Sequence, residues 1–222
     1  FFFKQKTAYE IVDCDWSSDV CSSDLGSPSS PYARKARIAM IEKNVLCEFV
    51  ADRPSSPDSN VPKYNPLGKV PVLALGDGKG MYDSSVIIEY FDGIGSGAKL
   101  IPAEFNARIA VKQWEALGDG ITDAIVALTH DPRYSASCDA NADWYQKQLK
   151  KIERGLATLE KDLGDNEFCH GGAFGLADIC AGMALGYMDR AYSQYNWRSK
   201  FPGLKRYADT LFARPSFRAT LA

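Results

Sequence analysis

Residues 65–73 read NPLGKVPVL, a stretch that places a proline at the head of an apolar strand. The run from Val70 to Leu75, VPVLAL, has the composition of a buried strand, and the turn sequence GDGKG follows it. Because Pro71 cannot donate a ladder hydrogen bond, it fits a sheet only where the start of the strand is special. A short antiparallel return strand is predicted over residues 80–82.

Helical patterns flank this pair of strands. Ser30 can cap a helix that begins at Pro31, because apolar residues recur at helical spacing from there to Lys43. A first strand should precede Gly26, since the order of elements is otherwise that of a small α/β unit. The predicted elements are a helix over 31–43, a strand over 45–50, a polar loop over 52–62, strands over 70–75 and 80–82, and a helix over 84–92.

The pattern changes after a Gly/Pro-containing linker at residues 96–103. From residue 104 onward the periods are long and helical, with almost no strand signal. The sequence therefore predicts an α/β domain over residues 26–95 and an all-helical domain over residues 104–222. Within the second domain, helices are predicted over 104–129, 141–163, 176–192 and 199–213.

Residues 1–25 do not fit this organisation. They contain two Lys, no Arg and five acids, which excludes a secretory signal and a transit peptide. DWSSDVCSSDL at 15–25 resembles one reading frame of a widely used sequencing-library adapter, and FKQKTAYEI at 3–11 resembles the matching primer end. We interpret residues 1–25 as a non-native, adapter-derived segment, with a true acidic arm as the alternative. On this interpretation the first strand of the α/β domain has been lost or replaced.

Without that segment, Lys plus Arg falls from 26 to 24 and Asp plus Glu from 28 to 23. The basic residues are interleaved with acids, so no nucleic-acid partner is expected. No apolar run approaches the roughly 18 residues that span a bilayer, so no membrane partner is expected either. The remaining cysteines lack a CxxC pair, which favours reduced thiols in a cytoplasmic protein over disulfides or a zinc site. They are Cys47, Cys138, Cys169 and Cys180.

The sequence SPYA at residues 30–33 lies at a predicted strand-to-helix turn, where glutaredoxins carry Cys-Pro-Tyr-Cys. Both sulfurs are absent, so dithiol exchange through this motif is excluded. The start of a helix favours an anion, and a thiol placed against Ser30 would be held there as thiolate. Lowering a thiol pKa by one unit needs about 1.4 kcal/mol, which one charge-assisted hydrogen bond supplies. The alternative is that Ser30 is only an N-cap.

Two further motifs place polar groups near that turn. In the sequence VP at 70–71, the backbone of Val70 could pair with an extended peptide ligand lying beside the strand. In YDSS at 82–85, Asp83 and Ser84 precede a helix, where they could hold the carboxylate and ammonium of a ligand. Helix capping by either residue is the simpler alternative.

SPYARKARI, NPLGKVPVL and YDSSVIIEYFD, in this order and spacing, resemble the cytosolic glutathione transferases, closest to bacterial serine-type and theta/zeta-like members. The resemblance covers residues 26–222. It implies a thioredoxin-like N-terminal domain with a cis proline, followed by an all-helical C-terminal domain. It also implies a cytoplasmic homodimer active in detoxification, with glutathione as co-substrate and without a further cofactor or metal.

The resemblance assigns roles to individual residues. Ser30 would activate the thiol, with Ser27 and Ser29 as weaker alternates. The other implied glutathione contacts are Val70 and Pro71 through the cis peptide, Asp83 and Ser84 for the γ-glutamyl group, and Lys69 and Lys43 as weaker candidates. For both lysines, a solvated surface residue is the alternative that we favour.

In the helical half the resemblance implies a second-substrate pocket near residues 114–128. Trp114 is a candidate lining residue, although a core position is favoured, and Asp119 is a candidate acid toward the ammonium of glutathione in a neighbouring subunit. Asp178 is expected to cap its helix without help from Gly175. His130 and His170 lack partners at metal-ligand spacing. Tyr187, Tyr192 and Trp197 suggest an aromatic lining, with ordinary helix packing as the alternative.

Conjugation of the glutathione thiolate to a small hydrophobic electrophile is therefore the leading hypothesis. One alternative is a glutathione- or partner-binding protein of the same fold without turnover, since a fold does not dictate a function. A second alternative is a glutathione-dependent peroxidase or disulfide reductase in which two glutathiones supply the electrons.

Overall fold

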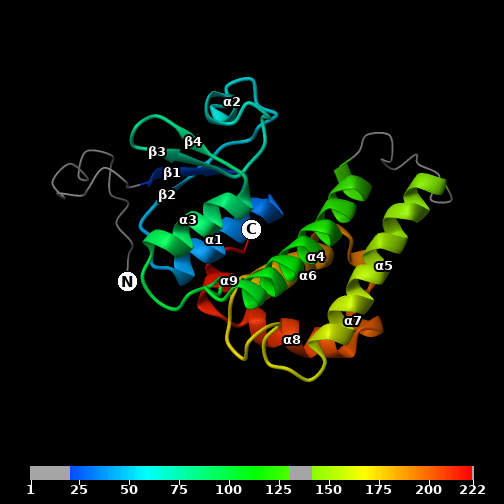
Figure 1. The fold of residues 1–222 in the computed structure, drawn as a ribbon. Coiled ribbons are helices and arrows are strands. Elements are labelled where there is room, and N and C mark those ends of the chain that lie inside the picture. Colours follow the sequence, from blue (N-terminus) through cyan, green and yellow to red (C-terminus); the bar gives the residue numbers. More distant parts are fainter. Residues whose placement is uncertain (1–20, 131–141, 222) are drawn as a thin grey trace, which may run out of the picture.

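The computed structural model describes residues 21–130 and 142–221, which form a sheet-containing half and a helical half (Figure 1). The first half contains β1 (Cys21–Gly26), α1 (Pro31–Glu42), β2 (Glu48–Ala51), α2 (Val61–Tyr64), β3 (Val72–Leu75), β4 (Gly80–Met81) and α3 (Ser84–Ile94). The second contains α4 (Phe105–His130), α5 (Asp143–Leu163), α6 (Leu176–Ala191), η2 (Ser193–Tyr195), α7 (Trp197–Lys200), α8 (Pro202–Phe212) and α9 (Pro215–Ala219). The predicted fold class, a thioredoxin-like domain followed by helices, is confirmed.

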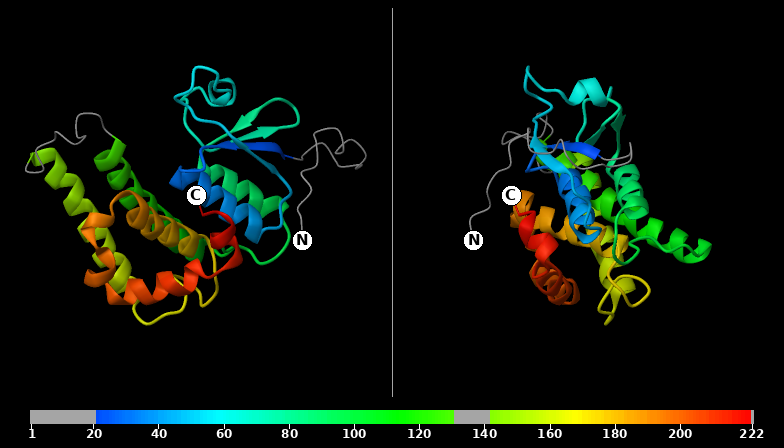
Figure 2. Two further views of the ribbon diagram at one scale, coloured as in Figure 1. Left: turned by 180° about the vertical axis from the view of Figure 1, so that it is seen from behind. Right: turned by 90° about the vertical axis from the view of Figure 1, so that its left-hand side faces the viewer.

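The four strands form one mixed sheet in the order β2-β1-β3-β4. β1 runs parallel to β2 and antiparallel to β3, and β3 runs antiparallel to β4. α1 and α3 cover one face of the sheet and α2 lies on the other, as the views in Figures 1 and 2 show. Successive side chains of β3 point to opposite faces of the sheet, which explains these two layers. Leu73 packs with residues of α1 and α3, while Val72 and Ala74 pack with Val61 of α2.

β1 supplies the predicted strand before Gly26, and it is built from residues of the adapter-like segment. Asp24 in this strand pairs in register with Leu73 and is fully buried. Neither of its carboxylate oxygens has a hydrogen-bond partner among the described residues. Burial raises the pKa of Asp24 to about 7, although the nearby Arg37 guanidinium acts to lower it. A core position of the sheet is therefore occupied by an unpartnered acid.

Several element boundaries differ from the predictions. β2 begins at Glu48 rather than at residue 45. The segment predicted as a polar loop ends in the short helix α2, which carries a proline in its first turn. The single helix predicted over 199–213 is divided into α7 and α8 at Phe201, because a residue before proline is pushed out of the helical region. α9 was not predicted, although Pro215 marks its first position.

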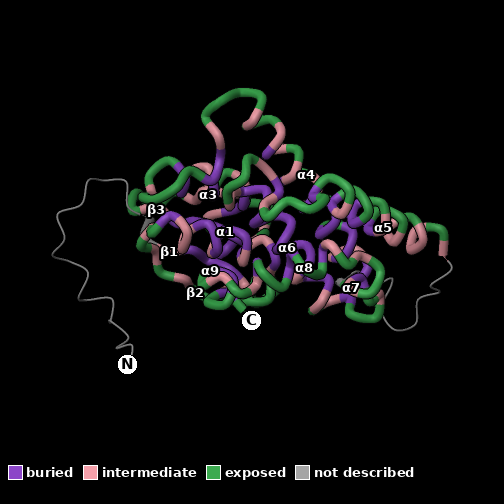
Figure 3. Tube along the Cα trace, turned by 90° about the horizontal axis from the view of Figure 1, so that it is seen from below, coloured by how far each residue is buried: buried purple, intermediate pink, exposed green. Residues whose placement is uncertain are grey.

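The core of the helical half is centred on α6, which is buried along most of its length, as Figure 3 shows. α4 crosses α6 closely, because a Cβ built on Gly118 would lie 2.8 Å from the Cys180 carbonyl oxygen. A larger residue at 118 would push the two helices apart. Cys180 is consequently fully buried, and burial raises the pKa of its thiol.

Asp178, in the first turn of α6, caps this helix as the sequence indicates. Its carboxylate accepts from the backbone N–H of Gly175 at 2.9 Å and of Cys169 at 2.8 Å. It also accepts from the hydroxyl of Tyr207 at 2.7 Å. Asp178 therefore caps α6 and ties it to α8 and to the preceding loop, which is a structural role.

α1 lies against both halves of the molecule, since it packs on α3 as well as on α6 and α9. Its buried Lys35 also forms ion pairs with α4, so α1 contacts a third helix of the helical half. Residues at the start of α1 are therefore held from two sides. Within residues 21–130 and 142–221, no helix is both long and apolar enough to cross a membrane.

Candidate functional site

Ser30 is the N-cap of α1 and lies half-buried at the junction of the two halves. Its Oγ accepts a hydrogen bond from the backbone N–H of Ala33 at 3.3 Å. A serine hydroxyl has one proton and two acceptor positions, so this cap leaves the Ser30 proton available to donate. The hydroxyl is thus both a helix cap and a donor at the positive end of a helix.

The two alternate serines are oriented differently. Ser27 and Ser29 place their hydroxyl oxygens 2.9 Å apart and bond to each other. The Ser27 carbonyl oxygen also accepts from the Ser30 backbone N–H at 2.9 Å, which forms the tight turn before α1. Only Ser30 has its hydroxyl at the helix start.

The peptide bond between Val70 and Pro71 is cis, as the family resemblance implies. The buried Asn65 fixes the preceding loop, because its amide donates to the Lys69 carbonyl oxygen at 2.8 Å and accepts from the Leu67 N–H at 2.9 Å. Val70 precedes β3, and its backbone N–H and C=O form no hydrogen bond with the described residues. This backbone is open to an extended ligand.

Asp83 and Ser84 lie at the start of α3. Asp83 is exposed and accepts from the backbone N–H of Ser85 at 3.1 Å, so it is the N-cap of this helix. Ser84 is buried. Asp83 therefore caps α3, which is the simpler of the two roles expected from the sequence. Its exposed carboxylate is still accessible to a ligand.

The two lysine candidates differ in environment. Lys69 is exposed, in agreement with a solvated lysine. For Lys43 the favoured alternative of a solvated lysine is wrong, because this side chain is fully buried. Lys43 Nζ lies 3.2 Å from Asp92 Oδ1 and donates to the Ala98 carbonyl oxygen at 2.9 Å. It attaches the linker to α1.

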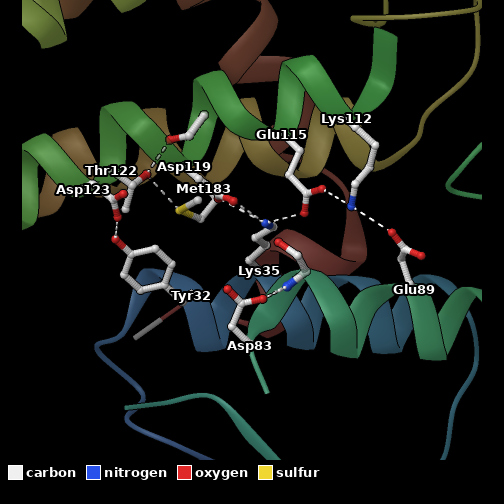
Figure 4. A network of polar contacts seen from close by, with 12 residues as sticks. Tyr32, Lys35, Asp83, Glu89, Lys112, Glu115, Asp119, Thr122, Asp123 and Met183 are labelled. Atoms are coloured by element: carbon white, nitrogen blue, oxygen red, sulfur yellow. Dashed lines mark hydrogen bonds and ion pairs between the residues drawn. The ribbon is translucent and has the colours of Figure 1, made fainter. Parts of the chain in front are cut away.

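Asp119 and Trp114 lie on α4, away from the pocket described next. Asp119 Oδ2 is 2.8 Å from Lys35 Nζ, in a network that also includes Glu115 (Figure 4). Burial alone would lower the pKa of Lys35, but Cys180 and the two carboxylates raise it overall. Trp114 is half-buried and packs on the helical core.

A pocket of about 270 Å³ opens beside Ser30, between the start of α1 and the C-terminal part of α6. Tyr187 lines it, whereas Tyr192 and Trp197, the other two aromatic candidates, are buried in the helical core. The lining residues are Pro28, Ser29, Ser30, Pro31, Arg34, Met183, Gly186, Tyr187, Asp189, Arg190, Phe212 and Leu221.

Sequence reasoning missed three of the pocket residues with the most distinctive chemistry. Arg34 could have been found, because it follows Ser30 by one helical turn and so shares its face. Arg190 and Phe212 could not, because only the packing of α6 and α8 against α1 brings them to this place. Two further residues named in the sequence analysis cannot be placed in this site. Cys138 and the side chain of His130 lie outside the described residues.

Comparison with known proteins identifies relatives of both halves. Residues 25–98 match the family model described as glutathione S-transferase, N-terminal domain, and residues 142–210 match the corresponding C-terminal domain. The uncharacterized GST-like protein YibF of Escherichia coli is 34% identical over 197 residues, which cover 88% of this chain and 96% of YibF.

Two solved structures extend the comparison. A glutathione S-transferase from Methylobacillus flagellatus, solved with glutathione bound, is 41% identical with a TM-score of 0.85, and the match covers 89% of this chain and 98% of that one. A glutathione transferase family member from Pseudomonas fluorescens was solved with bound S-(propanoic acid)-glutathione. It is 34% identical with a TM-score of 0.77, over 89% of this chain and 97% of that one.

Proposed function

The chain belongs to the glutathione S-transferase family, and on this premise we propose that it conjugates the thiolate of glutathione to small hydrophobic electrophiles. The observation that carries the proposal is the position of Ser30. Its hydroxyl caps α1, keeps a proton to donate, and lines a pocket of about 270 Å³. A thiolate and an electrophile can therefore meet at one helix start.

In this proposal glutathione lies along the sheet-containing half. Its backbone pairs with Val70 beside Pro71, and its γ-glutamyl end meets Asp83 and Ser84 at the start of α3, with Lys69 as a weaker contact. The open backbone of Val70 and the exposed carboxylate of Asp83 support this placement. So does the fact that the Methylobacillus flagellatus relative binds glutathione.

The reaction follows from this arrangement. The thiol releases its proton to water, and the Ser30 hydroxyl donates to the thiolate that remains. The sulfur then attacks an electrophilic carbon in the pocket, so that a C–S bond forms and the electron pair moves onto the electrophile or a leaving group. Serine-type chemistry of the theta/zeta-like kind is the subclass that we propose, and Ser30 supports it.

The proposal is tested with two variants that separate capping from catalysis. Ser30→Gly keeps a good N-cap and Ser30→Ala does not, but both remove the hydroxyl. Glutathione binding is measured by calorimetry and conjugation with a chloronitroaromatic. We expect both variants to bind glutathione and to lose roughly 10- to 100-fold in turnover, the value of one charge-assisted hydrogen bond.

The outcomes distinguish the alternatives. A protein without affinity for glutathione contradicts the whole proposal. Binding without turnover in the unaltered chain favours a binding protein of this fold. If Ser30→Gly turns over as fast as the unaltered chain, the hydroxyl is not the thiol-activating group.

We also propose a homodimer that forms through α3 and the start of α4. Glu89 of α3 pairs with Arg108 and Lys112 of α4 at 2.8 and 3.0 Å, so these helices lie together. Large apolar side chains are exposed on the same two helices. They are Val86 at 49%, Phe105 at 70% and Ile109 at 50% exposure.

Finally, we propose that residues 1–25 are foreign to the natural protein and that it works in the cytoplasm. The N-terminal family match begins at residue 25, and the unpartnered Asp24 occupies a core position of β1. The buried Cys169 and Cys180, which form no disulfide within the described part of the chain, support a reducing compartment. Sequencing the genomic DNA upstream of Gly26 tests the first statement, and an uninterrupted reading through DWSSDVCSSDL would contradict it.

A further inference from the structure

We propose that the pocket beside Ser30 selects electrophiles that carry a carboxylate, with Arg34 and Arg190 as the groups that bind it. This inference rests on the proposed function and names its substrate class. Both guanidinium groups line the same pocket as Ser30. An anionic group held there would fix the orientation of the electrophilic carbon toward the sulfur of glutathione.

Arg34 reaches the pocket from α1, one turn after Ser30. A Cβ built on Gly186 would lie 2.8 Å from Arg34 Nη1, so the guanidinium rests directly on the backbone of α6. Arg34 Nη2 also donates to the Phe217 carbonyl oxygen at 3.3 Å. The glycine at 186 thus leaves the space that this guanidinium occupies.

Arg190 lies one turn after Gly186 on the same helix, so the two guanidinium groups are neighbours. Arg190 Nη2 donates to the Ser29 carbonyl oxygen at 2.6 Å, and the guanidinium lies 5.4 Å from the centre of the Tyr187 ring. Burial lowers the pKa of Arg34, and the positive charges of Arg190 and Arg37 lower it further. A bound anion would relieve this repulsion.

Neither guanidinium has an acidic partner among residues 21–130 and 142–221. Asp189 is the acid that lines the pocket, but its Oδ2 lies 2.7 Å from Arg198 Nη2 and its Oδ1 accepts from Trp197. By contrast, Arg108, Arg198 and Arg214 each form an ion pair. Two guanidinium groups without an acidic partner among the described residues therefore line this pocket together.

The remaining walls set the shape of the ligand. Phe212, Tyr187, Met183 and Leu221 supply apolar surface beside the two cations. A planar ring that carries one carboxylate satisfies both, because guanidinium groups bind carboxylates in two-pronged fashion and stack on flat π systems. The substrate class is therefore an aromatic or otherwise compact carboxylate with an electrophilic carbon.

A halonitrobenzoate is a suitable probe, because its chemistry is balanced without a further reactant. The thiolate forms a C–S bond at the carbon that carries chlorine, and the electron pair moves into the nitro-substituted ring. The C–Cl bond then breaks and chloride leaves. The thiol proton passes to water.

The experiment compares 4-chloro-3-nitrobenzoate with 4-chloro-3-nitrobenzamide, which has the same shape without the charge. For each, kcat/KM with glutathione is divided by the uncatalysed rate constant, and the ratio of the two results is the carboxylate preference. Variants Arg34→Gln and Arg190→Gln remove the charges, and Arg34→Lys keeps one. Arg218→Gln is the control, since Arg218 is exposed on α9 and does not line the pocket.

We expect the unaltered chain to prefer the carboxylate and each glutamine variant to lose about tenfold of that preference. Arg218→Gln should retain it, and Arg34→Lys should retain part. Binding of the two product conjugates, S-(4-carboxy-2-nitrophenyl)glutathione and its amide, is measured by calorimetry as a readout that is independent of turnover and folding yield. The carboxylate conjugate should bind more tightly to the unaltered chain.

The two hypotheses fail in different ways. If glutathione and both conjugates do not bind, the proposed function is wrong and this inference is wrong with it. If glutathione and the amide conjugate bind but the carboxylate is not preferred, only the inference is wrong. The same holds if the preference survives in both glutamine variants, or falls equally in Arg218→Gln.

Discussion

Lys35 Nζ of α1 lies 2.8 Å from Glu115 Oε1 of α4, and the lysine side chain has no exposed surface (Figure 4). Asp119, which also lies on α4, is the second carboxylate that pairs with Lys35. Replacing Lys35 by Met would leave Asp119 without its cation and Glu115 with Lys112 as its remaining ion-pair partner. We expect Lys35→Met to lower the free energy of unfolding in urea by about 3–5 kcal/mol, the usual cost of breaking a buried pair.

The matched control for this change is Lys205→Met. Lys205 Nζ is 2.7 Å from Asp209 Oδ2, but both side chains are about half exposed. Its loss should change the free energy of unfolding by about 1 kcal/mol or less. Equal effects of the two substitutions would show that the buried pair does not stabilise the contact between the halves.

A second prediction concerns Asp24 in β1. Its pKa is raised to about 7 in the folded state by burial, above the 3.8 of an unperturbed aspartate, so the folded protein binds this proton more strongly than the unfolded chain. Stability is therefore lost as the pH rises from about 4 through about 7. We expect Asp24→Val to increase the free energy of unfolding at pH 8 by about 4 kcal/mol or more.

That gain should shrink as the pH falls toward about 4, because the folded state is then protonated and the pH approaches the unfolded-state pKa of 3.8. Urea unfolding from pH 4 to pH 8 measures it, with the exposed Asp165→Val as control. An Asp24→Val difference that is the same at every pH would mean that this carboxyl is not protonated on folding.

A third prediction concerns the cap of α6. Asp178→Ala would leave the N–H groups of Gly175 and Cys169 and the Tyr207 hydroxyl without their acceptor. We expect a loss of about 4 kcal/mol in the free energy of unfolding, because each buried unsatisfied donor is costly. Tyr207→Phe removes only one of the three bonds and should cost about 1 kcal/mol. Thermal unfolding compares them, and similar losses would contradict a shared cap.

The fourth prediction tests the dimer. Phe105→Ser combined with Ile109→Ser removes two of the exposed apolar side chains of α4. We expect light scattering to report a dimer for the unaltered chain and a monomer for the double variant, with the fold retained by circular dichroism. Leu46→Ser is the control, because Leu46 is 79% exposed and lies far from α4 in the sequence. A monomer in the unaltered chain would contradict the proposal directly.

Local chemistry made much of the fold predictable from the sequence. Ser30 and Pro31 mark a helix start by capping and by a fixed φ angle, and Pro71 at a strand head indicates a special backbone. The predicted helix boundaries were wrong where a single residue changes the backbone conformation. Pro202 divides a continuous apolar period into two helices, since periodicity alone does not register the restraint on Phe201.

The candidate site was predictable only where its residues lie close together in the sequence. Ser30 and the cis peptide at Pro71 belong to short motifs, whereas the pocket depends on how α6 and α8 pack on α1. The burial of Lys43 was missed for the same reason, because its partner Asp92 lies on another helix. A pairwise contact between distant helices leaves no local pattern of residues.

The close crossing of α4 and α6 at Gly118 makes Cys180 a kinetic probe. This thiol is fully buried, so an alkylating reagent can reach it only when the helices around it open. Its rate of labelling, read by mass spectrometry, would measure how often the interior of the helical half is exposed to solvent. Adding S-methylglutathione, which has no free thiol to consume the reagent, would then show whether ligand binding in the first half slows the opening of the second.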